Sequence, residues 1–194
     1  YTITGGTVVL DGGSSGAGKL LQMDNKEDVA AFTGDSYFHN LTISGYYYLT
    51  TYHPCIKGDL TISNGGEFDT YGERLHLEGD FITSGTGTSS WNSSGAGILT
   101  NSSGTESYFH LEGSSNQSVG SFNASDIGFG VFKGGGTATV NKYISCFDIY
   151  LGNGSDVNSS TFVVDDETLY FTQLFGYSGT FNVSGTGLAH IYNN

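Results

Sequence analysis

The densest group of carboxylates in the sequence is Asp165-Asp166-Glu167. Carboxylates that alternate along a strand edge can bind Ca²⁺, and a pair of them can serve as acid and base in the cleavage of polysaccharides. A solvated turn rich in acidic residues gives the same pattern without any chemistry. We expect such a turn here, with Ca²⁺ as the one ion that these residues could hold, and we predict no other cofactor and no catalytic residue.

The five histidines stand at separate points of the chain, and we predict no zinc site from them. His39 and His110 belong to two copies of the phrase Ser-Tyr-Phe-His, at 36–39 and 107–110. Copies of one phrase should occupy matching positions on successive structural repeats, where large side chains form ladders. We therefore expect these two histidines at equivalent stacked or surface positions.

Tyrosines are concentrated in the strand-like stretch 46–52. Alternate residues of a strand point to opposite faces, so an exposed row formed by Tyr46, Tyr48 and Tyr52 could stack on sugar rings or on a neighbouring subunit. In the alternative, one set of rings fills the core and the other decorates the surface. Packing is the favoured interpretation, and carbohydrate recognition is the alternative.

The elements that must position these residues repeat along the chain. Asn-Leu-Thr-Ile-Ser-Gly at 40–45 returns as Asp-Leu-Thr-Ile-Ser-Asn-Gly at 59–65 and as Asp-Phe-Ile-Thr-Ser-Gly at 80–85. Short β-branched strands closed by Ser and Gly, repeated at a period of about 20 residues, are typical of coils that stack. The fold is therefore predicted to be all-β, with one parallel β-solenoid (β-helix) domain over 1–194; a β-sandwich of the jelly-roll type is the alternative.

Stacking at this period makes further predictions. Leu41, Leu60 and Phe81 should occupy equivalent places on neighbouring coils, and the chain should form about 9 to 10 coils over about 45 Å. Cys55 and Cys146 should then lie about 20 Å apart, more than a disulfide tolerates, so no bridge is expected within the chain. Pairing within the chain would favour the sandwich, and pairing between chains would support assembly.

Composition limits the partners. Six basic residues against nineteen acidic ones give a net charge of −13, which repels nucleic acid. No apolar stretch approaches the roughly 18 residues of a membrane helix, so no membrane insertion is expected. Tyr1 in place of an initiator Met is expected of a mature product or of an excised fragment.

Eight Asn-X-Ser/Thr sequons, together with so few lysines, favour an extracellular, cell-surface glycoprotein. The predicted N-glycosylation acceptors are Asn40, Asn92, Asn101, Asn116, Asn123, Asn153, Asn158 and Asn182.

Three phrases carry a family resemblance: aromatic-x-Asn-Leu-Thr-Ile-x-Gly within 37–45, Gly-Asp-Leu-Thr-Ile-x-x-Gly-Gly at 58–66 and Phe-Asp-x-x-Gly at 68–72, which is followed by Leu-His-Leu-Glu-Gly-Asp-Phe at 75–81. They resemble the coils of repetitive β-solenoid surface proteins of bacteria and archaea. The likeness covers about residues 30–100. It implies an adhesin stalk, fibre, sheath or cell-wall role, and it brings no catalytic residues with it.

From these features we expect a structural protein, not an enzyme, whose partners are copies of itself. Strand-like sequences at 1–10 and 188–192 would leave open β-edges through which copies could assemble into a filament, sheath or surface layer. The alternative is an adhesin or carbohydrate-binding module that recognises polysaccharide. A polysaccharide-degrading β-helix enzyme is the least favoured, because the chain has one Arg and no Gly-His-Gly stretch.

Overall fold

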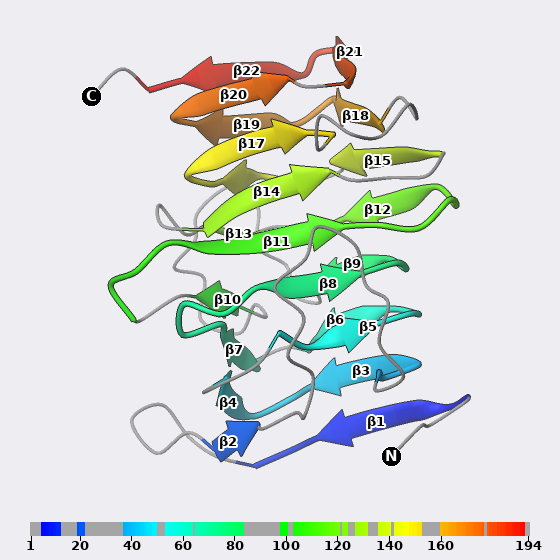
Figure 1. Ribbon diagram of the computed structural model, residues 1–194, viewed down its shortest axis with the longest axis vertical. Helices are drawn as coiled ribbons and strands as arrows, with labels where there is room; N and C mark the ends of the chain where they lie inside the picture. Colours follow the sequence, from blue (N-terminus) through cyan, green and yellow to red (C-terminus); the bar gives the residue numbers. More distant parts are fainter. Residues whose placement is uncertain are drawn as a thin grey trace.

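The computed structural model shows short strands stacked in parallel along one axis, with the two ends of the chain at opposite ends of the stack (Figure 1). All strand pairs in the described residues are parallel, and no described residue is helical, so the predicted all-β solenoid is confirmed. Nothing in the described chain forms a helix long and apolar enough to cross a membrane. The structure describes residues 5–12, 19–21, 37–49, 53–63, 65–83, 98–100, 103–120, 122–123, 127–131, 136–140, 142–152, 160–176 and 178–192.

One face of the solenoid is an eight-stranded sheet, which we call sheet A. Its strands, in spatial order, are β1 (Thr7–Leu10), β3 (Asn40–Ile43), β6 (Leu60–Ile62), β9 (Phe81–Thr83), β12 (Gln117–Val119), β15 (Thr137–Val140), β18 (Ser160–Asp165) and β21 (Gly179–Ser184).

A second face, sheet D, has six strands. They are β5 (Cys55–Ile56), β8 (Leu75–Leu77), β11 (Ser107–Leu111), β14 (Ile127–Val131), β17 (Asp148–Leu151) and β20 (Gln173–Gly176).

The third face consists of two four-stranded sheets that meet where β10 lies beside β13. The first contains β2 (Lys19–Leu21), β4 (Tyr46–Leu49), β7 (Glu67–Asp69) and β10 (Ile98–Thr100). The second, sheet E, contains β13 (Phe122–Asn123), β16 (Ile144–Ser145), β19 (Thr168–Phe171) and β22 (Leu188–Ile191).

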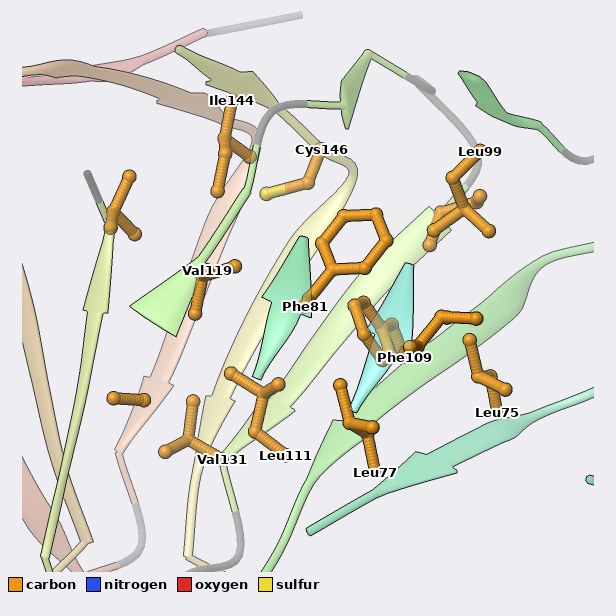
Figure 2. Packing of buried hydrophobic residues seen from close by; sticks show 14 of the residues in the cluster. Leu75, Leu77, Phe81, Leu99, Phe109, Leu111, Val119, Val131, Ile144 and Cys146 are labelled. Atoms are coloured by element: carbon orange, nitrogen blue, oxygen red, sulfur yellow. The ribbon is translucent and has the colours of Figure 1, made fainter. Parts of the chain in front are cut away.

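Side chains that point inward from the three faces form one continuous core (Figure 2). Leu41 pairs in register with Leu60, and Leu60 with Phe81, as the repeated phrase predicted. All three are fully buried, whereas Ile82, which points outward, is 39% exposed. Because alternate residues of each strand point inward, the inward side chains of neighbouring strands form an apolar ladder on the inner face of the sheet.

Several coils have the predicted length. Hydrogen-bonded positions one coil apart are separated by 19 residues between Asn40 and Asp59, and by 21 between Asp59 and Asp80. The coil from Asp80 to Ser118 is longer, at 38 residues. Longer coils use more residues, so the same chain forms fewer of them. The largest sheet, sheet A, has eight strands, fewer than the 9 to 10 coils expected.

A ladder of side-chain acceptors, which we call the turn ladder, joins neighbouring coils at the start of the sheet A strands. The Oδ1 atom of Asn40 accepts the backbone N–H of Asp59 at 2.8 Å, and Oδ1 of Asp59 accepts that of Asp80 at 2.9 Å. Oδ1 of Asp80 continues the ladder to the N–H of Ser118 at 2.7 Å. At the adjacent position a Cβ on Gly79 would overlap the Gly58 carbonyl, which explains why Gly precedes Asp in both coils.

The repeated phrase Ser-Tyr-Phe-His does not occupy equivalent positions, so this prediction was wrong. Phe38 bridges to Ile56, which pairs with Leu77, which pairs with Leu111. Phe38 therefore stands in the column of Leu111, two residues beyond Phe109. The longer coil between the two copies resets the register, so identical residues fall at different places on the same face.

Candidate functional site

The C-terminal coil, β20 to β22, exposes side chains that elsewhere form the core. Val183 is in register with the buried Val164, and Ile191 with the buried Phe171. Yet Val183 is 41% and Ile191 59% exposed. Leu174, in register with the buried Ile149, is 40% exposed. The apolar interior of the solenoid therefore reaches the surface at this end.

The three strands of that coil are also edge strands. Each stands last in its sheet, and in Figure 1 they lie together at the top of the stack. Their sequences, Gln-Leu-Phe-Gly, Gly-Thr-Phe-Asn-Val-Ser and Leu-Ala-His-Ile, contain no Lys, Arg, Asp, Glu or Pro. Charged residues and proline are the usual means by which proteins discourage pairing at a strand edge.

At the opposite end, β1 is the other edge of sheet A. Val8 and Leu10 are in register with Leu41 and Ile43 and are partly buried against the core. Residues 1–4, which belong to the strand predicted at 1–10, lie outside the described residues. β1 likewise consists only of uncharged residues, Thr-Val-Val-Leu.

Asp165 ends β18, and Asp166 and Glu167 form the predicted turn between β18 and β19. Asp166 has a positive φ of 54°. Its Oδ1 accepts the N–H of Thr186 at 2.6 Å, and Oδ1 of Asp165 accepts the hydroxyl of Ser184, also at 2.6 Å. These carboxylates thus join one turn to the turn stacked on it. Ca²⁺ binding at this place stays a prediction.

The tyrosine-rich strand β4 alternates as predicted. Tyr47 is buried and donates its hydroxyl to the carbonyl of Asp11 at 2.7 Å, while Tyr46 and Tyr48 are half-buried on the outer face. The Tyr48 ring lies 6.1 Å from that of Tyr71, which is 47% exposed. Tyr52 lies outside the described residues. Contact of Tyr46 and Tyr48 with sugar or with a subunit stays a prediction.

The sequons fall into four groups. Asn116 and Asn182 are exposed. Asn40 is half-buried and uses its side-chain oxygen in the turn ladder, and only the backbone of Asn123 is described. The acceptors outside the described residues are Asn92, Asn101, Asn153 and Asn158.

Cys55 and Cys146 are both buried free thiols. Cys55 is in β5 of sheet D, and Cys146 follows β16 of sheet E and belongs to the core. Burial raises the pKa of the Cys146 thiol, which keeps it protonated and unreactive.

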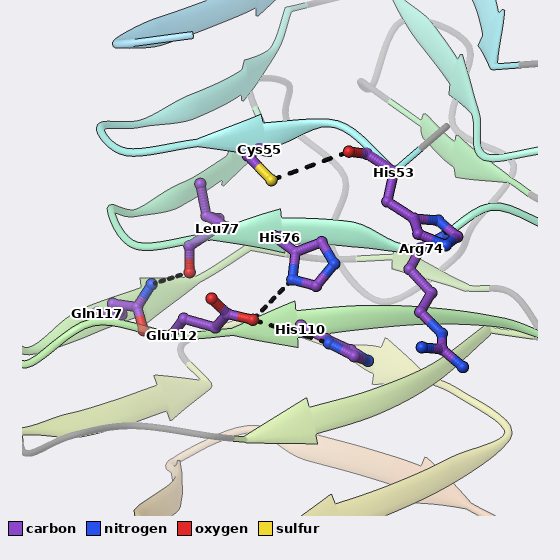
Figure 3. Close-up of polar contacts among 8 residues, drawn as sticks. All are labelled: His53, Cys55, Arg74, His76, Leu77, His110, Glu112 and Gln117. Carbon is purple, nitrogen blue, oxygen red and sulfur yellow. Dashed lines mark hydrogen bonds and ion pairs between the residues drawn. The ribbon is translucent and has the colours of Figure 1, made fainter. Parts of the chain in front are cut away.

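A buried polar cluster lies on the outer face of sheet D, and we call its three residues, His76, His110 and Glu112, the His-His-Glu cluster (Figure 3). His76 of β8 and His110 of β11 are in-register partners, and Glu112 directly follows β11. Leu75 and Leu77 belong to the core, so His76 between them points outward. It is nevertheless only 2% exposed, and the other two residues are 5% exposed.

The contacts inside the cluster converge on one carboxylate oxygen. Oε1 of Glu112 lies 2.7 Å from Nδ1 of His76 and 3.8 Å from Nδ1 of His110. The two imidazole rings meet edge to face with centroids 4.8 Å apart. Burial lowers the pKa of His110, and its contact with Glu112 opposes that effect. A neutral imidazole is the form of histidine that can bind a metal.

Sequence reasoning missed this cluster, although a signal was present. The tetrapeptide His-Leu-Glu-Gly occurs at 76–79 and again at 110–113. Each copy has the spacing His-x-Glu on one face of a strand. The repeated aromatic phrase matches His39 with His110 in the sequence. In the structure, His110 is instead the in-register partner of His76.

Comparison of the chain with protein-family models, with curated proteins and with solved structures finds no match. The parallel β-solenoid therefore rests on the pairing of the strands themselves. The narrower likeness to bacterial and archaeal surface proteins has only the sequence phrases behind it.

Proposed function

We propose that this protein is an extracellular structural protein that stacks end to end with copies of itself into a filament, sheath or surface layer. The observation that supports this most directly is the C-terminal coil. There the edge strands β20, β21 and β22 expose core positions and carry no charged residue or proline. Apolar surface and unpaired backbone groups at one place favour the addition of another strand layer.

The geometry of sheet A fits head-to-tail stacking. β1 and β21 are its two edges and run in the same direction, because every pair between them is parallel. β21 of one copy can therefore pair with β1 of the next copy and continue the sheet. Such a contact joins two different surfaces and does not close on itself, so it generates an open filament.

Location and charge belong to the same proposal. The exposed sequons Asn116 and Asn182 suit a glycosylated extracellular surface, as do the phrases shared with surface proteins. A net charge of −13 keeps copies apart at low ionic strength, so assembly requires the apolar ends to outweigh this repulsion. In this role the chain performs no catalysis.

A charge placed on the open end tests the proposal. Val183→Lys puts an ammonium group where the core continues, and Ile82→Lys puts the same charge on the outward face of β9, in the middle of sheet A and away from its edges. We expect the unchanged chain and Ile82→Lys to form filaments in negative-stain micrographs and fast-sedimenting species in the ultracentrifuge. Val183→Lys should remain monomeric.

Two results would contradict end-to-end stacking. One is an unchanged chain that remains a monomer at all concentrations and salt levels tried. The other is a polymer that Val183→Lys forms as readily as Ile82→Lys does, because its contacts would then lie away from the C-terminal coil.

A second candidate function is carbohydrate binding, which the outer-face tyrosines favour. Tyr46, Tyr48 and Tyr71 place three partly exposed rings near one another on and beside β4. Sugars stack on such rings through their apolar faces. Binding on a glycan array that Tyr48→Ala and Tyr71→Ala abolish would support this role, and Tyr150→Ala, in β17 of sheet D on another face of the solenoid, is the control.

A further inference from the structure

We propose that His76, His110 and Glu112 bind one divalent transition-metal ion, for which zinc is the best match, and that this ion fastens β8 to β11. The site is independent of the open ends, so it holds whether or not copies of the chain assemble.

The donors suit zinc in type and in distance. One donor atom from each residue lies within 4.8 Å of the other two. Two ligands of one tetrahedral zinc ion, each about 2.1 Å from the metal, lie about 3.4 Å apart. The distances from Oε1 of Glu112 to the two Nδ1 atoms, 2.7 and 3.8 Å, bracket that value. Two histidines and a glutamate form an accepted zinc set, with water as the fourth ligand.

Burial gives the cluster a need that a cation meets. A carboxylate removed from water is costly unless positive charge or hydrogen bonds compensate it. Glu112 is 5% exposed, and the two imidazole rings beside it are equally or more deeply buried. In addition, Nδ1 of His76 contacts Glu112, whereas Nε2 of the same ring is buried and has no hydrogen-bond partner among the described residues. The ring therefore has one nitrogen that no described protein group uses, and either nitrogen of a histidine can bind a metal.

The place of the cluster in the fold gives the metal a structural task. β8 and β11 belong to the coils on either side of the long connection, where Asp80 and Ser118 are 38 residues apart instead of about 20. Closing a longer loop costs more conformational entropy. An ion held by both strands would stabilise the stack across this lengthened coil.

Zinc titration of the full chain, first treated with EDTA, tests the proposal. By isothermal calorimetry we expect one high-affinity zinc ion per chain and a melting temperature that rises when zinc is added. Glu112→Gln should weaken binding at least about tenfold and remove the shift in melting temperature. Glu78→Gln is the matched control, since Glu78 belongs to the other His-Leu-Glu-Gly copy, is half-exposed and lies outside the cluster.

The outcome can overturn the proposal in two ways. The unchanged chain could bind zinc no better than Glu112→Gln does, or Glu78→Gln could lose as much affinity as Glu112→Gln. Should the ligand variants fail to fold, Co²⁺ bound to the unchanged chain decides. We expect the visible spectrum of a tetrahedral ion with nitrogen ligands, and the spectrum of an octahedral all-oxygen site would refute the assignment.

Discussion

Phe81 of β9 and Phe109 of β11 meet edge to face inside the solenoid, with ring centroids 5.1 Å apart and planes at 85° (Figure 2). They come from sheet A and sheet D, and both are almost fully buried. The contact therefore joins two faces of the solenoid, in addition to the ladders that join strands within each face. Aromatic pairs in this orientation stabilise a core beyond the area that they bury.

Removal of the Phe81 ring should be costly. Phe81→Ala leaves a cavity between two faces, and we expect the free energy of unfolding to fall by about 3–5 kcal/mol. Ile82→Ala, at the neighbouring exposed position, should change it by no more than about 0.5 kcal/mol. Urea unfolding followed by circular dichroism measures both values. Equal losses in the two variants would contradict the inward position of Phe81.

The turn ladder makes a different prediction for Asp59. Asp59→Ala removes the acceptor for the Asp80 N–H, and the loss of a hydrogen bond to a charged group should destabilise the chain by about 1.5–3 kcal/mol. Asp59→Asn keeps an acceptor oxygen at the same place, as Asn40 does in the preceding coil, so it should retain most of the stability. The same unfolding measurement separates them, and an Asn variant as weak as the Ala variant would show that charge matters more than the acceptor.

Proline at the open edge should block growth without unfolding the last coil. The N–H groups of Leu188 and Tyr192 bond to carbonyls of the preceding coil, so by alternation the N–H of Ile191 points toward the free edge. Ile191→Pro should therefore prevent assembly in light-scattering measurements, while Ile191→Val should assemble normally. Assembly of the proline variant at an undiminished rate would mean that β22 is not part of the contact.

Salt should promote assembly. Copies with a net charge of −13 repel one another, and added salt screens that repulsion over distances of about 10 Å at 0.1 M. The contacts expected at the ends are apolar and lose little on screening. Light scattering at increasing sodium chloride should show faster growth. Slower growth would indicate that ion pairs hold the copies together.

Asp148 should make stability depend on pH. Burial, and then the nearby Glu106 carboxylate, raise the pKa of Asp148, and its Oδ1 has no hydrogen-bond partner in the described structure. Because the folded-state pKa exceeds the unfolded value, the fold prefers the protonated acid and loses stability as pH rises through that pKa. Asp148→Asn, which stays neutral, should be the more stable chain at neutral pH. The difference should vanish in acid; a variant that is less stable at neutral pH would refute this.

Local sequence predicted the stacking where coils have equal length. The phrase that holds Leu41, Leu60 and Phe81 recurs at a nearly constant period, and those residues are in register in the structure. Because each of these coils places the same side chains inward, the repeat and the alternation together specify both the fold class and the neighbours of each strand. The stacking of this region could therefore be predicted from the sequence alone.

Tertiary structure alone decided what happens across the longer coil. Phe81 pairs with Val119, and His110 pairs with His76 rather than matching His39. Once a coil is lengthened, its return register is set by how all three faces pack on the coil before it, and no local phrase records that choice. The His-His-Glu cluster and the exposed core positions of the last coil both depend on contacts between residues distant in the chain. For this reason the sequence by itself determined the repeat, and only the packed solenoid determined the sites.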